Sequence, residues 1–134
     1  MNQRQGAQAT ILSAKAATGF GTPLDVSKYR FIGIAIAGAT LPNLTVKCQG
    51  SFLMKVDPNL DFTTAQSVSN LWDYIAVDDL QDGMTRIEGD TGIAFAGTAD
   101  VRMFKVNVDQ LRTINFHVTA YVAGAVTVIA FPIQ

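Results

Sequence analysis

The chain has 134 residues, of which 49% are hydrophobic and 16% are charged, and its formal net charge is −1. This length accommodates one domain with a proper core and leaves no comfortable room for a second. Nucleic-acid binders usually carry a basic patch or stripe, whereas the Lys and Arg residues here are spread along the chain, so nucleic-acid binding is not expected. The charged fraction lies below the usual quarter, which predicts that some apolar surface faces a partner.

Cysteine usage and hydropathy indicate where the chain folds. Cys48 is the sole cysteine, so neither an intrachain disulfide nor a cysteine-based metal site can form within one chain. The first residues contain no run of seven apolar residues, and nowhere do eighteen apolar residues follow one another. We therefore expect no signal peptide, no membrane contact, and folding in a cytoplasm.

The chain begins with a segment unlike the rest. Residues 1–8 are polar and rich in glutamine, so they cannot bury enough surface to order themselves. We expect a flexible arm over residues 1–8, either a loose tail or a segment that docks on a neighbour, and a single β-sandwich domain over residues 9–134. The first strand is predicted at residues 9–16, and the segment TGFGTP, with two glycines and a proline, ends it.

Two alternating stretches come next. Over residues 30–37, isoleucines at 32, 34 and 36 share one face, while Phe31 and small residues share the other and leave room for a close second layer. Gly, Pro and Asn predict a turn over residues 38–43. In the strand predicted over residues 44–52, the inward positions are Val46, Cys48, Gly50 and Phe52.

The middle of the chain is less regular. Residues 54–71, with a turn at Asp57-Pro58-Asn59, are predicted to cross between two sheets on an exposed edge. Trp72 and Tyr74 share one face of the strand that follows, and a turn is expected over residues 78–83. Further strands are predicted at residues 71–77, 84–88, 93–97 and 99–108.

The stretch RTINFHVTAYVAGAVTVIAFP, residues 112–132, is predicted to form two long strands joined at Ala123-Gly124. In its first half the inward positions are Ile114, Phe116, Val118, Ala120 and Val122. The opposite face carries Thr113, Asn115, His117, Thr119 and Tyr121. The second half is apolar on both faces, and such a strand is covered by the core on one side and by another layer or another subunit on the other.

These elements define the fold class. Eight or nine strands at spacings of about 8–15 residues, with no helical period, predict an all-β antiparallel sandwich of the jelly-roll or Greek-key kind. An all-parallel sheet would need helical crossovers, for which only residues 61–70 leave space.

Residues able to carry chemistry do not form a motif. His117 is the sole histidine and has no serine or cysteine placed beside it, so we interpret it as a surface or interface residue rather than part of a triad or metal site. Asp78, Asp79 and Asp82 lack the ligand alternation and closing Glu of a calcium loop, which favours a solvated turn. Cys48 sits at a core position, where an inert packed thiol is expected.

Other candidates stay open from the sequence. A glycosidase would need two carboxylates at a catalytic spacing, which the sequence cannot place. The glycines follow no phosphate-loop pattern. Aromatic residues could form a sugar-stacking platform, although core packing explains most of them. The carboxylates are Asp57, Asp61, Asp73, Glu88, Asp90, Asp100 and Asp109, and the aromatic residues are Phe20, Tyr29, Phe52, Phe62, Trp72, Tyr74 and Tyr121.

Four segments together carry a family resemblance. They are DVSKYRFIGIAIAG (25–38), VKCQGS (46–51), WDYIAVDD (72–79) and FKVNVDQLRTINFHVTAYVAGAVTVIAFP (104–132). In this order they resemble small structural proteins of tailed bacteriophages. The resemblance covers most of the chain and implies a virion component, most like a capsid decoration (cement) protein.

A decoration protein performs no chemistry and binds the outer capsid surface to stabilise the head. The resemblance therefore implies a non-enzymatic protein without cofactor or small-molecule substrate. It also implies the major capsid protein as partner, a homotrimer, and a place on the virion after synthesis in the bacterial cytoplasm. The flat apolar face expected to form the interface consists of Ala125, Thr127, Ile129 and Phe131.

Two alternatives remain. One is a tail-fibre or baseplate module that recognises host glycan with a similar sandwich. The other is a free carbohydrate-binding or hydrolytic β-sandwich. Stacking aromatic residues and a carboxylate pair in one groove would favour these, whereas three-fold contacts through the apolar strand face would favour decoration.

Overall fold

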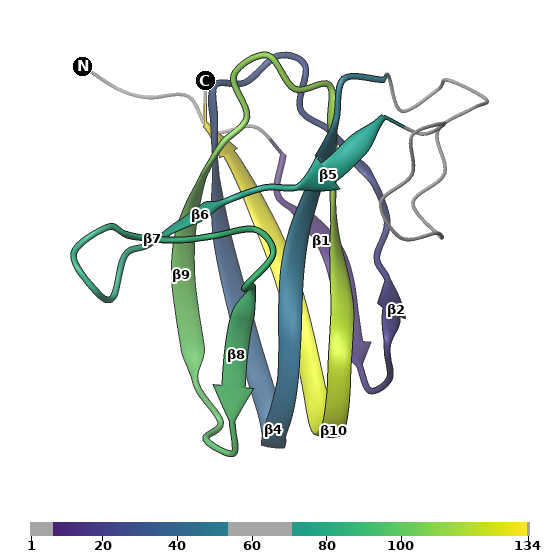
Figure 1. The fold of residues 1–134 in the computed structure, drawn as a ribbon, viewed down its shortest axis with the longest axis vertical. Coiled ribbons are helices and arrows are strands. Elements are labelled where there is room, and N and C mark those ends of the chain that lie inside the picture. Colours follow the sequence, from purple (N-terminus) through teal and green to yellow (C-terminus); the bar gives the residue numbers. More distant parts are fainter. Residues whose placement is uncertain (1–6, 54–70, 134) are drawn as a thin grey trace.

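The computed structural model describes residues 7–53 and 71–133, and within these ranges all helical or strand structure is β. Ten strands pair antiparallel in one continuous sheet that folds over on itself (Figure 1), which confirms the predicted all-β antiparallel class. Most of the predicted arm and of the predicted connection at residues 54–71 lies outside the described residues. The strands are β1 (Ala9–Lys15), β2 (Gly19–Phe20), β3 (Leu24–Asp25), β4 (Phe31–Ser51), β5 (Trp72–Tyr74), β6 (Val77–Asp79), β7 (Thr85–Ile87), β8 (Ile93–Ala96), β9 (Val101–Asn107) and β10 (Thr113–Ile133).

Strands β4 and β10 organise the molecule. Each has 21 residues, which would span about 70 Å if straight, more than a domain of this size can hold. Both strands therefore bend together at the lower end of Figure 1 while remaining paired on either side of the bend. The first layer contains residues 31–39 of β4 and 125–133 of β10, with β1, β9, β6 and β7. The second layer contains residues 43–51 of β4 and 113–123 of β10, with β2, β3, β5 and β8.

The bend depends on unusual backbone conformations. Gly124 has a φ of +83°, and a Cβ added there would lie 2.5 Å from the Cα of Pro42. Thr40 and Leu41 also adopt positive φ values, 59° and 53°, which is rare for residues with a Cβ. The turn predicted at residues 38–43 and the joint predicted at Ala123-Gly124 are thus one shared bend. They do not separate strands, because pairing resumes directly on both sides.

The core fills the concave side of the folded ribbon. The predicted alternation is confirmed for the isoleucines of β4 and for Val46 and Cys48, all at most 2% exposed. Phe104 and Val106 of β9 are buried in the same core. Gly50 makes space in the same core, since a Cβ there would lie 2.8 Å from the Cδ1 of Leu111. One cluster therefore connects both layers.

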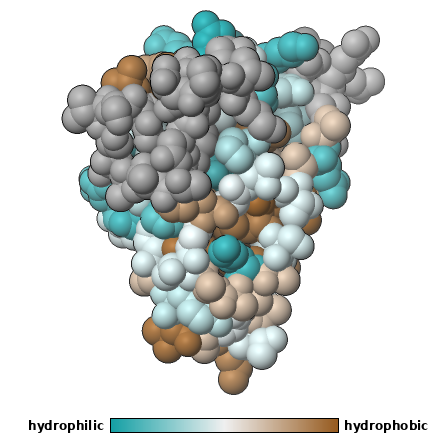
Figure 2. Space-filling view, turned by 90° about the vertical axis from the view of Figure 1, so that its right-hand side faces the viewer, coloured by the Kyte–Doolittle hydropathy of each residue, from teal (hydrophilic) through white to brown (hydrophobic). Residues whose placement is uncertain are grey.

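Three inward predictions are wrong. Val122 is 72% exposed and Ala120 is also exposed, because pairing shifts on both sides of Tyr121 and disturbs the alternation before the bend. Phe52 is 67% exposed because β4 ends at Ser51. Figure 2 shows hydrophobic side chains at the lower end of the molecule, the end formed by the bend that carries Val122 and the 71% exposed Leu41.

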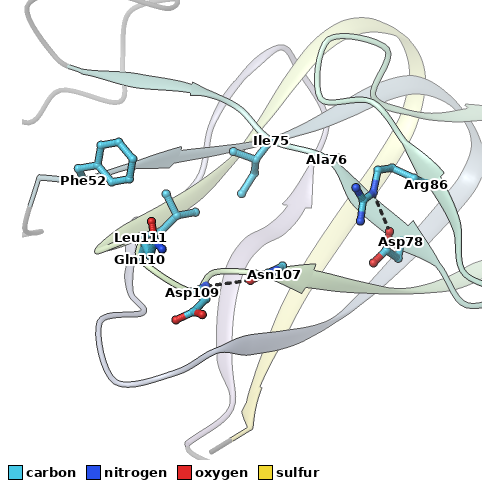
Figure 3. A pocket seen from close by; sticks show the side chains of 9 residues that line it. All are labelled: Phe52, Ile75, Ala76, Asp78, Arg86, Asn107, Asp109, Gln110 and Leu111. Carbon is cyan, nitrogen blue, oxygen red and sulfur yellow. Dashed lines mark hydrogen bonds and ion pairs between the residues drawn. The ribbon is translucent and has the colours of Figure 1, made fainter.

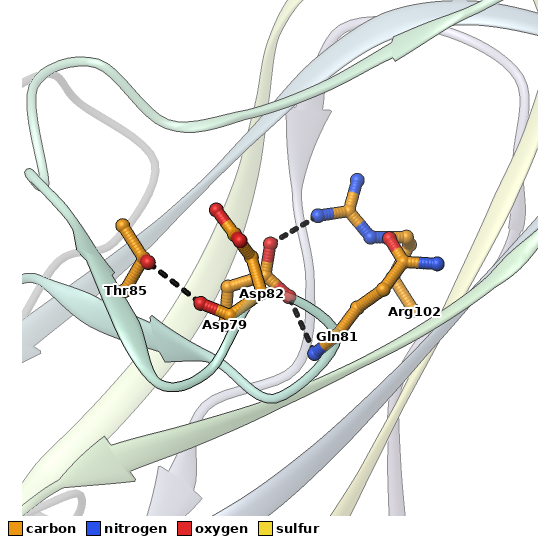
Figure 4. Close-up of polar contacts among 5 residues, drawn as sticks. All are labelled: Asp79, Gln81, Asp82, Thr85 and Arg102. Carbon is orange, nitrogen blue, oxygen red and sulfur yellow. Dashed lines mark hydrogen bonds and ion pairs between the residues drawn. The ribbon is translucent and has the colours of Figure 1, made fainter.

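Residues 71–77 were expected to form one strand, which is wrong, because they form parts of two. β5 pairs with β4 in the second layer, whereas β6 pairs with β9 in the first layer. β6 includes Asp78 and Asp79, which were expected in a turn. Asp79 is buried and forms an ion pair with Arg102 of β9, and its carboxylate also accepts a hydrogen bond from the backbone N–H of Gln81 (Figure 4). This pair attaches β6 and the turn after it to the first layer.

Candidate functional site

The outer side of the first layer is an apolar sheet face built by three neighbouring strands. Cross-strand pairing places Phe131 opposite Gly33 and Ile129 opposite Ala35, and Met103 lies on the other side of Ala35. The face consists of Phe31, Gly33, Ala35, Ala37, Val101, Met103, Ala125, Thr127, Ile129, Phe131 and Ile133. It therefore contains all four residues predicted as an interface from the sequence.

The side chains of this apolar sheet face are more exposed to solvent than those of a core face would be. Val101 and Met103 are 57% and 56% exposed, and the four predicted interface residues are half-buried. At the edge of this face the Nζ of Lys105, which pairs with Gly33, lies over the ring of Phe31 at 4.0 Å from the centroid. Three strands of about seven residues cover roughly 300–400 Å² at the usual spacings, a size at which exposed apolar patches are often functional.

The outer side of the second layer has a different character. His117 stacks on Phe20 with ring centroids 3.9 Å apart, and its Nδ1 lies 2.8 Å from the hydroxyl of Tyr74. Trp72 meets both Phe20 and Tyr74 edge to face. Lys47 lies over the Tyr74 ring at 4.9 Å. These aromatic groups, from three strands in three distant parts of the chain, contact one another.

The electrostatics of this cluster follow from partial burial. Burial lowers the pKa of His117, and the nearby positive charge of Lys47 lowers the same pKa further. Burial raises the pKa of Tyr74, to which the negative charge of Asp90 also contributes. Both effects favour the neutral forms, in which one hydroxyl proton can be shared between Tyr74 and His117.

Two amides lie beside the cluster. Asn115 is buried, its Nδ2 donates to the carbonyl of Gly21, and its Oδ1 accepts from the backbone N–H of Phe116. Gln49 is its cross-strand neighbour and is also fully buried. In the described part of the chain, the side-chain amide of Gln49 makes no hydrogen bond. The opposite face of β10 is thus more buried than the alternation of Thr113, Asn115 and His117 suggested.

The remaining candidates are distributed over the structure. The solvated-turn interpretation is correct for Asp82, but it is wrong for Asp79, which is buried and paired, while Asp78 forms an ion pair with Arg86 at 3.3 Å. Burial raises the pKa of the Cys48 thiol well above its usual range, in agreement with a packed thiol. Over residues 7–53 and 71–133, no group of three or more His, Cys, Asp or Glu residues could hold a metal ion. The same ranges contain no helix long and apolar enough to cross a membrane.

Sequence reasoning found part of each surface. The apolar half of β10 was evident from its composition, whereas the contribution of Val101 and Met103 depends on the pairing of β9 with β4. The aromatic cluster was missed as a unit, because Phe20, Trp72 and His117 are far apart in sequence. A signal for it was present in the shared face of Trp72 and Tyr74 and in the outward position of His117.

The chain is thus a β-sandwich with two different outer faces. On the second layer the aromatic side chains contact one another, and on the first layer the described residues leave the apolar sheet face uncovered. No protein-family model matches the chain, and no curated protein matches it. Among solved structures, the crystal structure of the SPBc2 prophage-derived protein YomS is similar, with a TM-score of 0.69. The likeness covers 100% of this chain and 96% of that chain at 14% sequence identity, which shows a shared fold.

Proposed function

We propose that this chain is a non-enzymatic structural protein of a tailed-phage virion that binds the outer capsid surface as a decoration protein. The apolar sheet face carries this proposal, since it joins the four predicted interface residues to Val101 and Met103 in one flat surface. The prophage origin of the structurally similar protein supports a phage protein. The sequence motifs that resemble phage structural proteins support it independently.

The geometry of the apolar sheet face suits adhesion between proteins. The middle strand of the face presents only small residues, Gly33, Ala35 and Ala37, so that a second sheet or subunit can approach its backbone closely. Ile129 and Phe131 stand beside this row and supply apolar area. At about 25 cal/mol per Å², covering roughly 300–400 Å² would contribute about 8–10 kcal/mol before the entropic costs of association.

We infer a homotrimer that uses this face between its own subunits. A trimer presents three copies of every remaining surface to the capsid, and multivalent attachment raises avidity without strong individual contacts. The bend, with Leu41 and Val122 exposed, is then available to the major capsid protein. No catalytic step is required of any residue in this role.

A tail-fibre or baseplate module that recognises host glycan is the second candidate. One observation favours it: the exposed ring of Phe52 and two carboxylates, Asp78 and Asp109, line the same pocket. This combination of an aromatic residue with carboxylates in one groove is the arrangement expected for sugar recognition.

Immuno-electron microscopy of virions released from the strain that carries this chain tests the proposal. Antibody label distributed over the heads is the expected result. Label confined to tails or baseplates would replace the decoration role by the second candidate. Particles that contain none of the protein would overturn a virion role altogether.

A further inference from the structure

A pocket of about 490 Å³ lies at the end of the molecule opposite the bend. Its walls come from the residue after β4, the segment between β5 and β6, strands β6 and β7, and the end of β9 with the loop that follows (Figure 3). The volume is within the range of small-ligand sites. Its polar wall adjoins the apolar sheet face, since Asn107 pairs with Phe31 and Asp78 pairs with Lys105.

One end of the pocket is apolar. Ile75 and Leu111 form its floor, and both are held over Gly50, where an added Cβ would lie 2.8 Å from Leu111 and 3.3 Å from Ile75. The ring of Phe52 stands beside them, 67% exposed (Figure 3). The floor is therefore fixed by packing, while the aromatic ring can meet a ligand.

The other end is polar and already ordered. The Nε of Arg86 lies 3.3 Å from one carboxylate oxygen of Asp78, which leaves the second oxygen as an acceptor and the terminal guanidinium nitrogens as donors. The Oδ1 of Asn107 accepts the backbone N–H of Asp109 at 3.0 Å. This bond orients the Asn107 amide so that its NH₂ group can donate elsewhere (Figure 3).

The charges at this polar end nearly cancel. Asp78 is paired with Arg86, and Asp109 lies 3.9 Å from Arg30, which is outside the pocket lining. An anionic ligand would meet two carboxylates, and a cation would meet the guanidinium of Arg86. A neutral ligand rich in hydroxyl groups can instead use both donors and acceptors, because each hydroxyl is donor and acceptor at once.

We propose that this pocket binds a neutral saccharide. Its hydroxyl groups bond to Asp78, Arg86 and Asn107, while the apolar C–H face of a sugar ring lies against Phe52. The inference stands on the pocket alone and does not depend on capsid decoration or on the apolar sheet face.

Titration by NMR with neutral di- and trisaccharides of glucose, galactose and their N-acetylamino derivatives tests this inference, with matched uronic-acid sugars as the anionic comparison. The variants are Phe52→Ala and Asn107→Ala, both at exposed positions, with Val122→Ala and Asn43→Ala as matched exposed controls near the bend. Circular dichroism and light scattering establish that fold and assembly are unchanged, so a loss of sugar binding is separated from a failure of the assembly proposal.

The expected result is saturable binding of at least one neutral sugar, with shifts at residues 107–111. Each pocket variant weakens it about fivefold or more, and both controls leave it unchanged. The inference is overturned if no neutral saccharide binds saturably, if binding survives both pocket variants, or if only the anionic sugars bind.

Discussion

The two outer faces of this sandwich are built from the same two strands, β4 and β10, and differ in how their groups are partnered. On the second layer, His117 stacks on Phe20 and meets the Tyr74 hydroxyl, and Asn115 bonds to backbone on both sides. On the first layer, the apolar sheet face exposes Met103 and Val101 beside Ile129 and Phe131. Apart from the amide of Gln49, which makes no hydrogen bond within the described residues, these groups of the second layer contact one another or the backbone, whereas an uncovered apolar face gains free energy from a partner.

The largest expected effect is on self-association, when a single negative charge is introduced into the apolar sheet face. Ile129→Asp or Phe131→Asp places a carboxylate in the apolar sheet face, where an interface would have to desolvate it. We expect self-association to weaken about 30-fold while the fold survives, because hot-spot residues near the centre of an interface contribute about 2 kcal/mol or more. Sedimentation over a concentration series measures this.

The matched control for that comparison is Thr119→Asp, which introduces the same charge at a half-buried position of β10 in the second layer. Its self-association should equal that of the unmodified protein. If Thr119→Asp disrupts assembly and Ile129→Asp does not, the roles of the two faces have been assigned in reverse.

The second effect concerns the bend that both layers share. Gly124→Ala is expected to lower the free energy of unfolding by more than about 2 kcal/mol, because the added Cβ meets the backbone of Pro42 in addition to the strain of positive φ. Urea denaturation monitored by circular dichroism measures the loss.

Gly97→Ala provides the control for strain alone. Gly97 also has positive φ, +93°, but nothing lies within 4 Å of an added Cβ. We expect a loss of about 1 kcal/mol. Equal losses in the two variants would show that the close packing of Pro42 on Gly124 does not stabilise the bend.

A third prediction tests the hydrogen bond between Tyr74 and His117 in the second layer. Tyr74→Phe removes the hydroxyl that meets His117 and should lower stability by about 1 kcal/mol. Tyr29→Phe is the matched control, since the Tyr29 hydroxyl makes no hydrogen bond within the described residues. Indistinguishable denaturation midpoints for the two variants would contradict a stabilising role for this hydrogen bond.

The smallest effect depends on pH. The pKa of His117 is lowered in the folded protein, so below its unfolded value of about 6.5 the unfolded chain binds more protons. Stability should therefore be constant above that pH and decrease as pH falls toward the folded pKa. Thermal melts between pH 8 and about pH 5 should show this decrease, and His117→Gln should reduce it.

His117→Ala provides a further check on the same face. We expect this variant to retain full assembly, because His117 belongs to the self-contacting cluster and not to the apolar sheet face. A large loss of assembly or of binding would show that the second layer carries a functional surface of its own.

The fold class and the part of the candidate interface that lies on β10 could be predicted from the sequence, for a physical reason. Strand alternation is local, so Val46 and Phe116 could be placed in the core, and Ile129 and Phe131 on an outer face, without knowledge of the strand pairing. The bend could not be predicted from the same alternation. Gly124 and residues 38–43 carry ordinary turn signals, and only the continued pairing of β4 with β10 shows that neither strand ends there.

Features that depend on distant pairing were not predictable. Asp79 occurs in a run of acidic residues typical of a surface turn, and its burial follows from Arg102, which β9 brings beside it. The pocket likewise unites Phe52, Arg86 and Asn107 from segments that the sequence leaves unconnected. The missing information in each case was strand order.

The mass of the purified protein in solution, measured by light scattering at two concentrations, tests most directly whether the apolar sheet face is an assembly surface. We expect a trimer with three times the chain mass of 14.4 kDa, stable on dilution. A monomer at both concentrations would contradict it.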